Sequence, residues 1–65
     1  MNALMLKGRI VAKGFTQAEI AKKLGVSKTT FNNKLNGKSE FTASEIKKLV
    51  LILDIDDIIA YFFAR

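Results

Sequence analysis

Residues 16–38 read TQAEIAKKLGVSKTTFNNKLNGK, and most of the fold can be worked out from them. A glycine divides the segment into two runs that each carry apolar residues at helical spacing. In the first run, Thr16 and Glu19 have the spacing of a capping box, which predicts the start of a helix. In the second run, Phe31 and Leu35 lie one helical turn apart and face the same side. The segment therefore predicts two short helices joined by a glycine turn.

The connection between these two helices has residues suited to a tight turn. Gly25 supplies the positive φ that ends the first helix, and Ser27 is expected to cap the second. Val26, between them, is expected to fill the angle between the helices. The inward side of the first helix is expected to comprise Ile20, Ala21 and Leu24.

The flanking segments also predict helices. A first helix over about residues 3–13, with Leu6 and Ile10 facing inward, is expected to end at Gly14. After the stop at Asn36-Gly37, a second capping box opens a fourth helix with four inward residues, namely Ile46, Leu49, Val50 and Leu53. Asp56 is expected to cap a last helix whose inward residues are Ile58, Ile59 and Phe62.

A strand over residues 49–59 is the alternative for the second half, because Val, Ile and Leu are dense there. The apolar spacing follows the 3.6-residue period better than alternation, and no Gly or Asn turn pairs this segment with a second strand. The sequence thus predicts an all-α fold: one compact domain over residues 1–65, with five helices.

Composition excludes several kinds of site. The 65 residues include no Cys, His, Pro or Trp, so a disulfide, a thiolate nucleophile and a His-based metal site are all impossible. The clustered acids Asp54, Asp56 and Asp57 suit a turn and a cap, so we expect no catalytic residue, no metal and no cofactor. Because cysteine is absent, and neither a leader peptide nor a membrane span is recognisable, a cytoplasmic location is expected.

Charge is distributed unevenly along the chain. Residues 1–40 carry eight Lys or Arg and two Glu, a net charge of +6, whereas residues 41–65 carry three Lys or Arg and four Asp or Glu, a net charge of −1. A basic field attracts phosphate backbones, although it also serves solubility alone. The N-terminal part is therefore the expected partner of a polyanion.

The helix expected after Gly25 has one polar face that is suited to bases. Taken at 100° per residue, five side chains fall within an arc of roughly 140°: Lys28, Thr29, Asn32, Asn33 and Asn36. Asn can bond adenine bidentately, Lys can bond guanine, and Thr offers a hydroxyl and a methyl group. A merely solvated face is the alternative, but three Asn are poor helix formers, which favours DNA reading.

Other residues are candidates for phosphate contacts. Gln17 starts the helix that would cross the sugar-phosphate backbone, where the positive end of the helix would assist it. Lys38 follows the end of the reading helix, and Lys22 and Lys34 are further candidates. Lys34 is the weakest, because its helical position points away from the polar arc.

Several positions in this segment together resemble a known family. They are Gln17, Ala21, Leu24-Gly25-Val26, Phe31 and Leu35-Asn36-Gly37-Lys38. In these residues the chain resembles the helix-turn-helix of the Cro and cI repressors, the xenobiotic-response-element-like family of phage and bacterial regulators. The resemblance implies base reading by Ser27, Lys28, Thr29, Asn32 and Asn33, and phosphate contacts by Gln17, Asn36 and Lys38. It further implies a small, phage Cro-like repressor that binds a palindromic operator in double-stranded DNA as a dimer.

The chain departs from this family at two points. Many members have an acidic pair before Asn-Gly, where this chain has Lys34-Leu35, so apolar contact is expected to replace any ion pair there. Large repressors add a C-terminal oligomerisation or sensing domain, which is why the small Cro-like type is expected here.

The expected last helix is more apolar than a single core requires. Tyr61, Phe62 and Phe63 widen its apolar arc to about 200°, so some of these side chains should remain exposed in a monomer. They are the expected homodimer interface. Collapse over the core opposite Leu4 and Met5 is the alternative, and a heterodimer with another repressor is a rival partner.

A second function class remains open. The same fold could serve as an antirepressor or other protein-interaction module that binds another regulator through its apolar C-terminal helix. Membrane-surface binding is a distant third possibility, because the acidic residues at positions 54, 56 and 57 would face anionic lipid.

Overall fold

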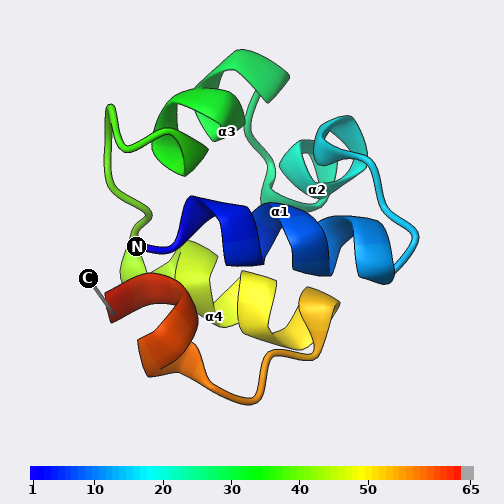
Figure 1. The fold of residues 1–65 in the computed structure, drawn as a ribbon. Coiled ribbons are helices and arrows are strands. Elements are labelled where there is room, and N and C mark those ends of the chain that lie inside the picture. Colours follow the sequence, from blue (N-terminus) through cyan, green and yellow to red (C-terminus); the bar gives the residue numbers. More distant parts are fainter. Residues whose placement is uncertain (64–65) are drawn as a thin grey trace.

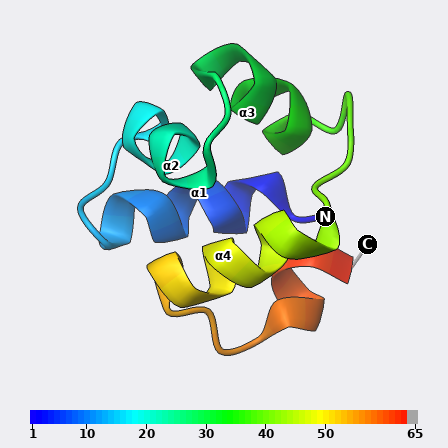
Figure 2. The same cartoon turned by 180° about the vertical axis from the view of Figure 1, so that it is seen from behind.

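The computed structural model describes residues 1–63, which form an all-α fold with no strand among them. The α-helices are α1 (Ala3–Ala12), α2 (Gln17–Leu24), α3 (Lys28–Leu35) and α4 (Ala43–Leu53), and a short π-helix, η1 (Ile59–Phe63), follows. Both ribbon views show α1 across the middle, with α2 and α3 on one side and α4 and η1 on the other (Figure 1 and Figure 2). The predicted fold class is therefore confirmed.

One core joins all of these elements. Its fully buried members include Leu6 of α1, Ile20 of α2, Phe31 of α3 and Leu49 of α4. The rings of Phe31 and Phe41 lie 5.8 Å apart, and Phe41 in turn meets Phe62 edge-on at 6.3 Å. These aromatic contacts connect α3 through the 36–42 segment to the last helix.

The predicted caps hold α2 and α4 at their starts. The Thr16 and Thr42 side chains each accept a hydrogen bond from the N–H of a glutamate three residues later, and the carboxylate of that glutamate accepts one from the threonine N–H. In Glu19, the Thr16 N–H and hydroxyl lower the pKa below its ordinary value. At the other end of α2, Gly25 has a φ of 78°, which lets the Val26 N–H reach the Ala21 carbonyl at 3.0 Å.

The turn between α4 and the last helix differs from the prediction in which residue caps the last helix. Asp54 takes a left-handed conformation with a φ of 54°, and the Ile55 N–H closes the turn on the Val50 carbonyl. The cap of the last helix is Asp57, whose Oδ1 accepts the Ala60 N–H at 3.0 Å, so the expectation for Asp56 was wrong.

The inward stripe expected for the last helix is also partly wrong. Phe62 is buried, but Ile58 is 40% exposed and Ile59 is 69% exposed. The reason is that the segment forms a π-helix, with hydrogen bonds five residues apart, so a 100° step does not describe its faces.

Polar contacts tie α1 to the second half of the chain. The Arg9 guanidinium donates to the carbonyls of Leu53 and Asp54, both at 2.8 Å, and so satisfies the free C-terminal end of α4. The Asn2 N–H donates to the Tyr61 carbonyl at 2.9 Å. The last helix is therefore held beside the start of α1.

Candidate nucleic-acid interface

The polar residues predicted to read bases form the outward side of α3. Lys28 and Thr29, in its first turn, are exposed, and Asn32 and Asn33 are half-buried one turn later. Phe31 and Leu35 of the same helix are buried in the core. Lys28, Asn32 and Asn33 each carry hydrogen-bond donors, and the Thr29 hydroxyl both donates and accepts.

The predicted site residues at the ends of the helices are placed differently. Ser27 is exposed, but its Oγ accepts the Thr30 N–H at 3.0 Å and donates to the Thr30 Oγ1 at 2.9 Å, so this side chain caps α3. Asn36, at the C-cap of α3, and Lys38 are exposed. Gln17 is half-buried at the first position of α2, which packs on α3.

Lys34 is held in a buried ion pair and is not a phosphate contact. Its Nζ lies 2.6 Å from Glu45 Oε1, and the two side chains are 14% and 12% exposed. The same carboxylate oxygen accepts the Thr42 N–H at 2.8 Å. The expectation that apolar contact replaces an ion pair at this position was therefore wrong, because the carboxylate comes from α4 instead of α3.

The pKa of Glu45 reflects this environment. Burial acts to raise the pKa, but the hydrogen bond and charge of Lys34, together with the Thr42 N–H and hydroxyl, outweigh it. The net pKa lies below the ordinary value of 4.5, so Glu45 is ionised at neutral pH. A charged pair thus fastens the C-terminal turn of α3 to the first turn of α4.

Not all of the basic charge of residues 1–40 is free to meet a polyanion. Arg9 bonds the end of α4, Lys13 lies 3.6 Å from the Asp54 carboxylate, and Lys23 lies over the Phe15 ring at 5.5 Å. Within residues 1–63, no carboxylate pairs with Lys22, Lys28 or Lys38, all of which are exposed. Sequence reasoning missed the structural use of Arg9, since its partners are backbone carbonyls more than forty residues away.

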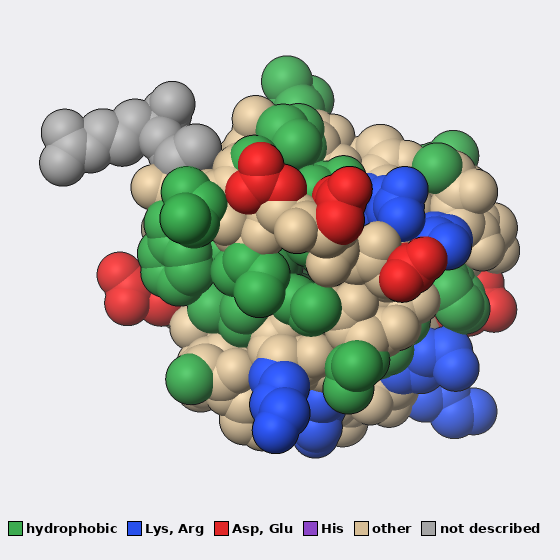
Figure 3. Space-filling view, turned by 90° about the horizontal axis from the view of Figure 1, so that it is seen from below, with side chains coloured by type: hydrophobic (Ala, Val, Ile, Leu, Met, Phe, Trp, Pro, Cys, Tyr) green, Lys and Arg blue, Asp and Glu red, His purple; other side chains and the backbone are tan. Residues whose placement is uncertain are grey.

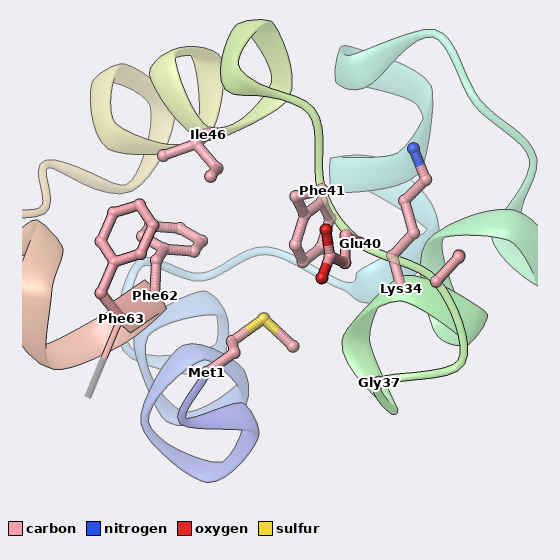
Figure 4. Close-up of a pocket in the computed structure, with 9 residues that line it drawn as sticks. Met1, Lys34, Gly37, Glu40, Phe41, Ile46, Phe62 and Phe63 are labelled. Carbon is pink, nitrogen blue, oxygen red and sulfur yellow. The ribbon is translucent and has the colours of Figure 1, made fainter. Parts of the chain in front are cut away.

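The aromatic residues predicted as a dimer interface are divided between core and surface. Phe62 is buried in its own chain, Tyr61 is half-buried, and Phe63 is 65% exposed. Phe63 lies at the edge of a groove of about 350 Å³, with Phe41 and Phe62 in its lining (Figure 4). Lys34 and Gly37 line the opposite side of the groove. Only Phe63 and the outer part of Tyr61 are left for a partner.

Comparison with known proteins gives one match. The family model described as "Protein of unknown function (DUF739)" matches residues 3–65. The chain belongs to the DUF739 family. The matched range covers α1 to η1, so the whole set of helices described above belongs to the DUF739 unit. No curated protein matches the chain, and no solved structure matches it.

The described part of this DUF739 chain has neither a membrane-spanning helix nor a cluster of metal ligands. Within residues 1–63, no helix has both the length and the apolar character needed to cross a bilayer. The same residues contain no group of three or more acidic side chains that could hold a metal ion.

Proposed function

We propose that this protein is a sequence-specific regulator of transcription that binds double-stranded DNA through α3. The observation that carries the proposal is the outward side of α3, where Lys28, Thr29, Asn32 and Asn33 lie on a helix fixed from behind by two buried residues. Side chains of these types can bond base edges in the major groove. A helix that is rigidly held can present them in one register.

The placement of free basic residues supports the same proposal. Lys28 begins α3 and Lys38 follows its end, so cations flank the polar face at both ends. Cations in such positions suit the phosphates that border a groove, and phosphate contacts set the position of a reading helix without specifying sequence. Gln17, at the N-terminus of α2, is proposed to bond a neighbouring phosphate.

We further propose that the protein binds a palindromic operator as a homodimer and acts as a repressor in the cytoplasm. Two reading helices that enter successive major grooves must lie about 34 Å apart and face the same side of the DNA. Phe63, at the edge of the groove of Figure 4, and the outer part of Tyr61 are the proposed contact. The proposed contact lies on the last helix, which was also the expected interface.

Selection of bound sites from random DNA, followed by affinity measurements at several salt concentrations, tests the proposal. Asn33→Ala should weaken binding to the selected site by about 1–3 kcal/mol and relax its preference at one position. Lys38→Ala should weaken selected and unrelated DNA alike and reduce the salt dependence. If no sequence is enriched, or if Asn33→Ala binds the selected site like the wild type, α3 does not read DNA.

A second candidate function is supported by the exposed Phe63. An antirepressor or other interaction module would bind another regulator through this side chain and the adjoining groove. Such a protein would show no salt-dependent binding to DNA, and Phe63→Ser would remove binding to the regulator whereas Asn33→Ala would not.

A further inference from the structure

The outward side of α4 is an exposed surface that neither the core nor the proposed DNA interface uses. Leu51 lies on this side and is 75% exposed, while Leu49 and Leu53 on the opposite side are fully buried. Lys47 and Lys48 precede Leu51 by one helical turn, and Asp54 follows it by one turn. All three charged residues are exposed.

The surface around Leu51 is apolar, and charged side chains of both signs lie at its borders. Figure 3 shows hydrophobic side chains on this face of the molecule, with acidic side chains above them and basic side chains both below them and next to the acidic ones at the upper right. Ile58 and Ile59, which follow the acidic turn at residues 54–57, are 40% and 69% exposed. An exposed apolar surface with a charged rim is typical of a contact with another protein.

The charge at the C-terminal end of α4 is unfavourable for an isolated helix. The helix dipole favours anions at the N-terminus and cations at the C-terminus, but the last turn of α4 has no basic residue and Asp54 follows it. Arg9 compensates the last carbonyls, yet Lys13 is 3.6 Å from an Asp54 carboxylate that remains 84% exposed. Stability of α4 alone therefore does not explain the acidic residue at its C-terminal end.

We propose that this surface binds the same surface of a second copy of the chain, with the two α4 helices antiparallel and crossing at Leu51. With the two-fold axis at Leu51 and the helices antiparallel, residues that precede position 51 in one copy face residues that follow it in the other. Lys47 and Lys48 precede Leu51 by one turn, and the acidic turn at residues 54–57 follows it. The two lysines of each copy therefore approach the acidic turn of the other copy.

The charges favour a second copy of the chain as the partner, because a two-fold interface must be complementary to itself. A purely acidic or purely basic partner would match only one border of the surface, whereas a second copy matches both. Repulsion is also small on this side, since residues 41–65 carry a net charge of −1 against +6 for residues 1–40. The opposite charges contribute mainly to the orientation and rate of the encounter, and the apolar residues contribute burial.

This contact is distinct from the proposed operator dimer. The ribbon views place α3 and α4 on opposite sides of α1 (Figure 1 and Figure 2), so two copies joined through α4 direct their α3 helices away from each other. They cannot place both in successive major grooves of one operator. If the proposed DNA binding holds, a pair of this kind would join two separate DNA segments.

The absence of cysteine from the chain allows a site-specific test. In Leu51→Cys the two new thiols lie at the two-fold axis, where a disulfide needs Cβ atoms about 3.5–4.5 Å apart. The matched control is Val11→Cys, because Val11 on α1 is 74% exposed and lies outside the proposed contact. Under mild oxidation the Leu51→Cys protein should form disulfide-linked dimers at least about tenfold faster than the control, since a preformed contact raises the effective thiol concentration.

Charge reversal then tests the antiparallel arrangement. Lys47→Glu/Lys48→Glu in the Leu51→Cys background should slow cross-linking to the control rate, because like charges would meet. Asp54→Asn/Asp56→Lys in the same background should also be slow, and an equimolar mixture of the two proteins should cross-link quickly as a heterodimer. Asp57 is left unchanged because it caps η1.

Three outcomes would overturn the proposal: equal rates for the Leu51→Cys and Val11→Cys proteins, no effect of charge reversal, or no recovery in the mixture. Far-UV circular dichroism checks that each variant is folded. If a charge variant unfolds, the cross-linking rate of the Leu51→Cys protein is measured at high salt instead. Salt screens the opposite charges, so cross-linking should become slower. An unchanged rate would refute the arrangement. DNA binding is not part of this measurement, so failure of either proposal leaves the other to its own test.

Discussion

The Lys34–Glu45 pair allows a quantitative test of how α3 is held. The atoms Nζ and Oε1 lie 2.6 Å apart, and both side chains are more than four-fifths buried. Lys34→Met keeps most of the apolar part of the lysine side chain. It leaves the Glu45 carboxylate with Thr42 as its remaining hydrogen-bond partner. Breaking a buried pair by removing one partner costs about 3–5 kcal/mol, and the remaining Thr42 bond places the expected loss near the lower end, about 3 kcal/mol.

This loss should be visible in both chemical and thermal unfolding. For a domain of this size, each kcal/mol corresponds to about 4–8 °C in Tm, so Lys34→Met should lower Tm by roughly 12–24 °C. Urea unfolding followed by far-UV circular dichroism at pH 7 gives the free energy directly. Lys28→Met is the matched control, since Lys28 is exposed on the same helix and should change stability by less than about 0.5 kcal/mol.

A double variant separates the ion pair from the cap. Glu45→Gln keeps an oxygen that can accept the Thr42 N–H, and a glutamine is a normal member of a capping box. Lys34→Met/Glu45→Gln removes both charges and keeps the cap, so its stability should return to within about 1 kcal/mol of the wild type. The ion pair does not hold α3 in this way if Lys34→Met costs less than about 0.5 kcal/mol, or if the double variant is no more stable than Lys34→Met.

Three further predictions concern stability. The pKa of Glu45 is lowered in the folded state, so the free energy of unfolding of the wild type should fall as pH drops below about 4.5. The difference in unfolding free energy between the wild type and Lys34→Met, measured by urea titration, should become smaller over the same range. A difference that stays constant from pH 7 to pH 3 would contradict this. Gly25→Val should cost about 1–2 kcal/mol in urea unfolding, because a β-branched residue is strained at a φ of 78°, and an unchanged midpoint would count against the turn. Arg9→Met should cost about 1–3 kcal/mol by losing two charged hydrogen bonds to α4 carbonyls, and should speed amide exchange at the end of α4; unchanged exchange would show that Arg9 does not hold it.

Local chemistry made much of the fold predictable. The capping boxes at Thr16 and Thr42 depend on residues three positions apart, so their pattern is visible in the sequence and is present in the structure. The positive φ of Gly25 and the burial of Phe31 and Leu35 likewise follow from residue type and helical spacing. The polar side of α3 was predicted for the same reason, although its role in DNA reading remains a proposal.

The last helix shows where periodicity is insufficient. Its residues were assigned to faces with a 100° step, but the segment forms a π-helix capped by Asp57, which turns Ile59 outward. A left-handed residue at Asp54 ends α4 before this segment, and the Arg9 bonds to the Leu53 and Asp54 carbonyls hold that turn. These contacts depend on the approach of α1, which no local pattern encodes.

By itself, then, the sequence determined the helices, their caps, the glycine turn and the sides of α2 and α3 that face the core, because these features depend on neighbours within four residues. Only the tertiary structure decided which charges are free. It paired Lys34 with Glu45 across eleven positions and brought Arg9 to the end of α4. It also left Leu51, with Lys48 before it and Asp54 after it, uncovered on the side away from α3. The physical reason is that a charge or an apolar side chain is engaged or left free by whichever helix packs beside it, and that packing joins residues far apart in the chain.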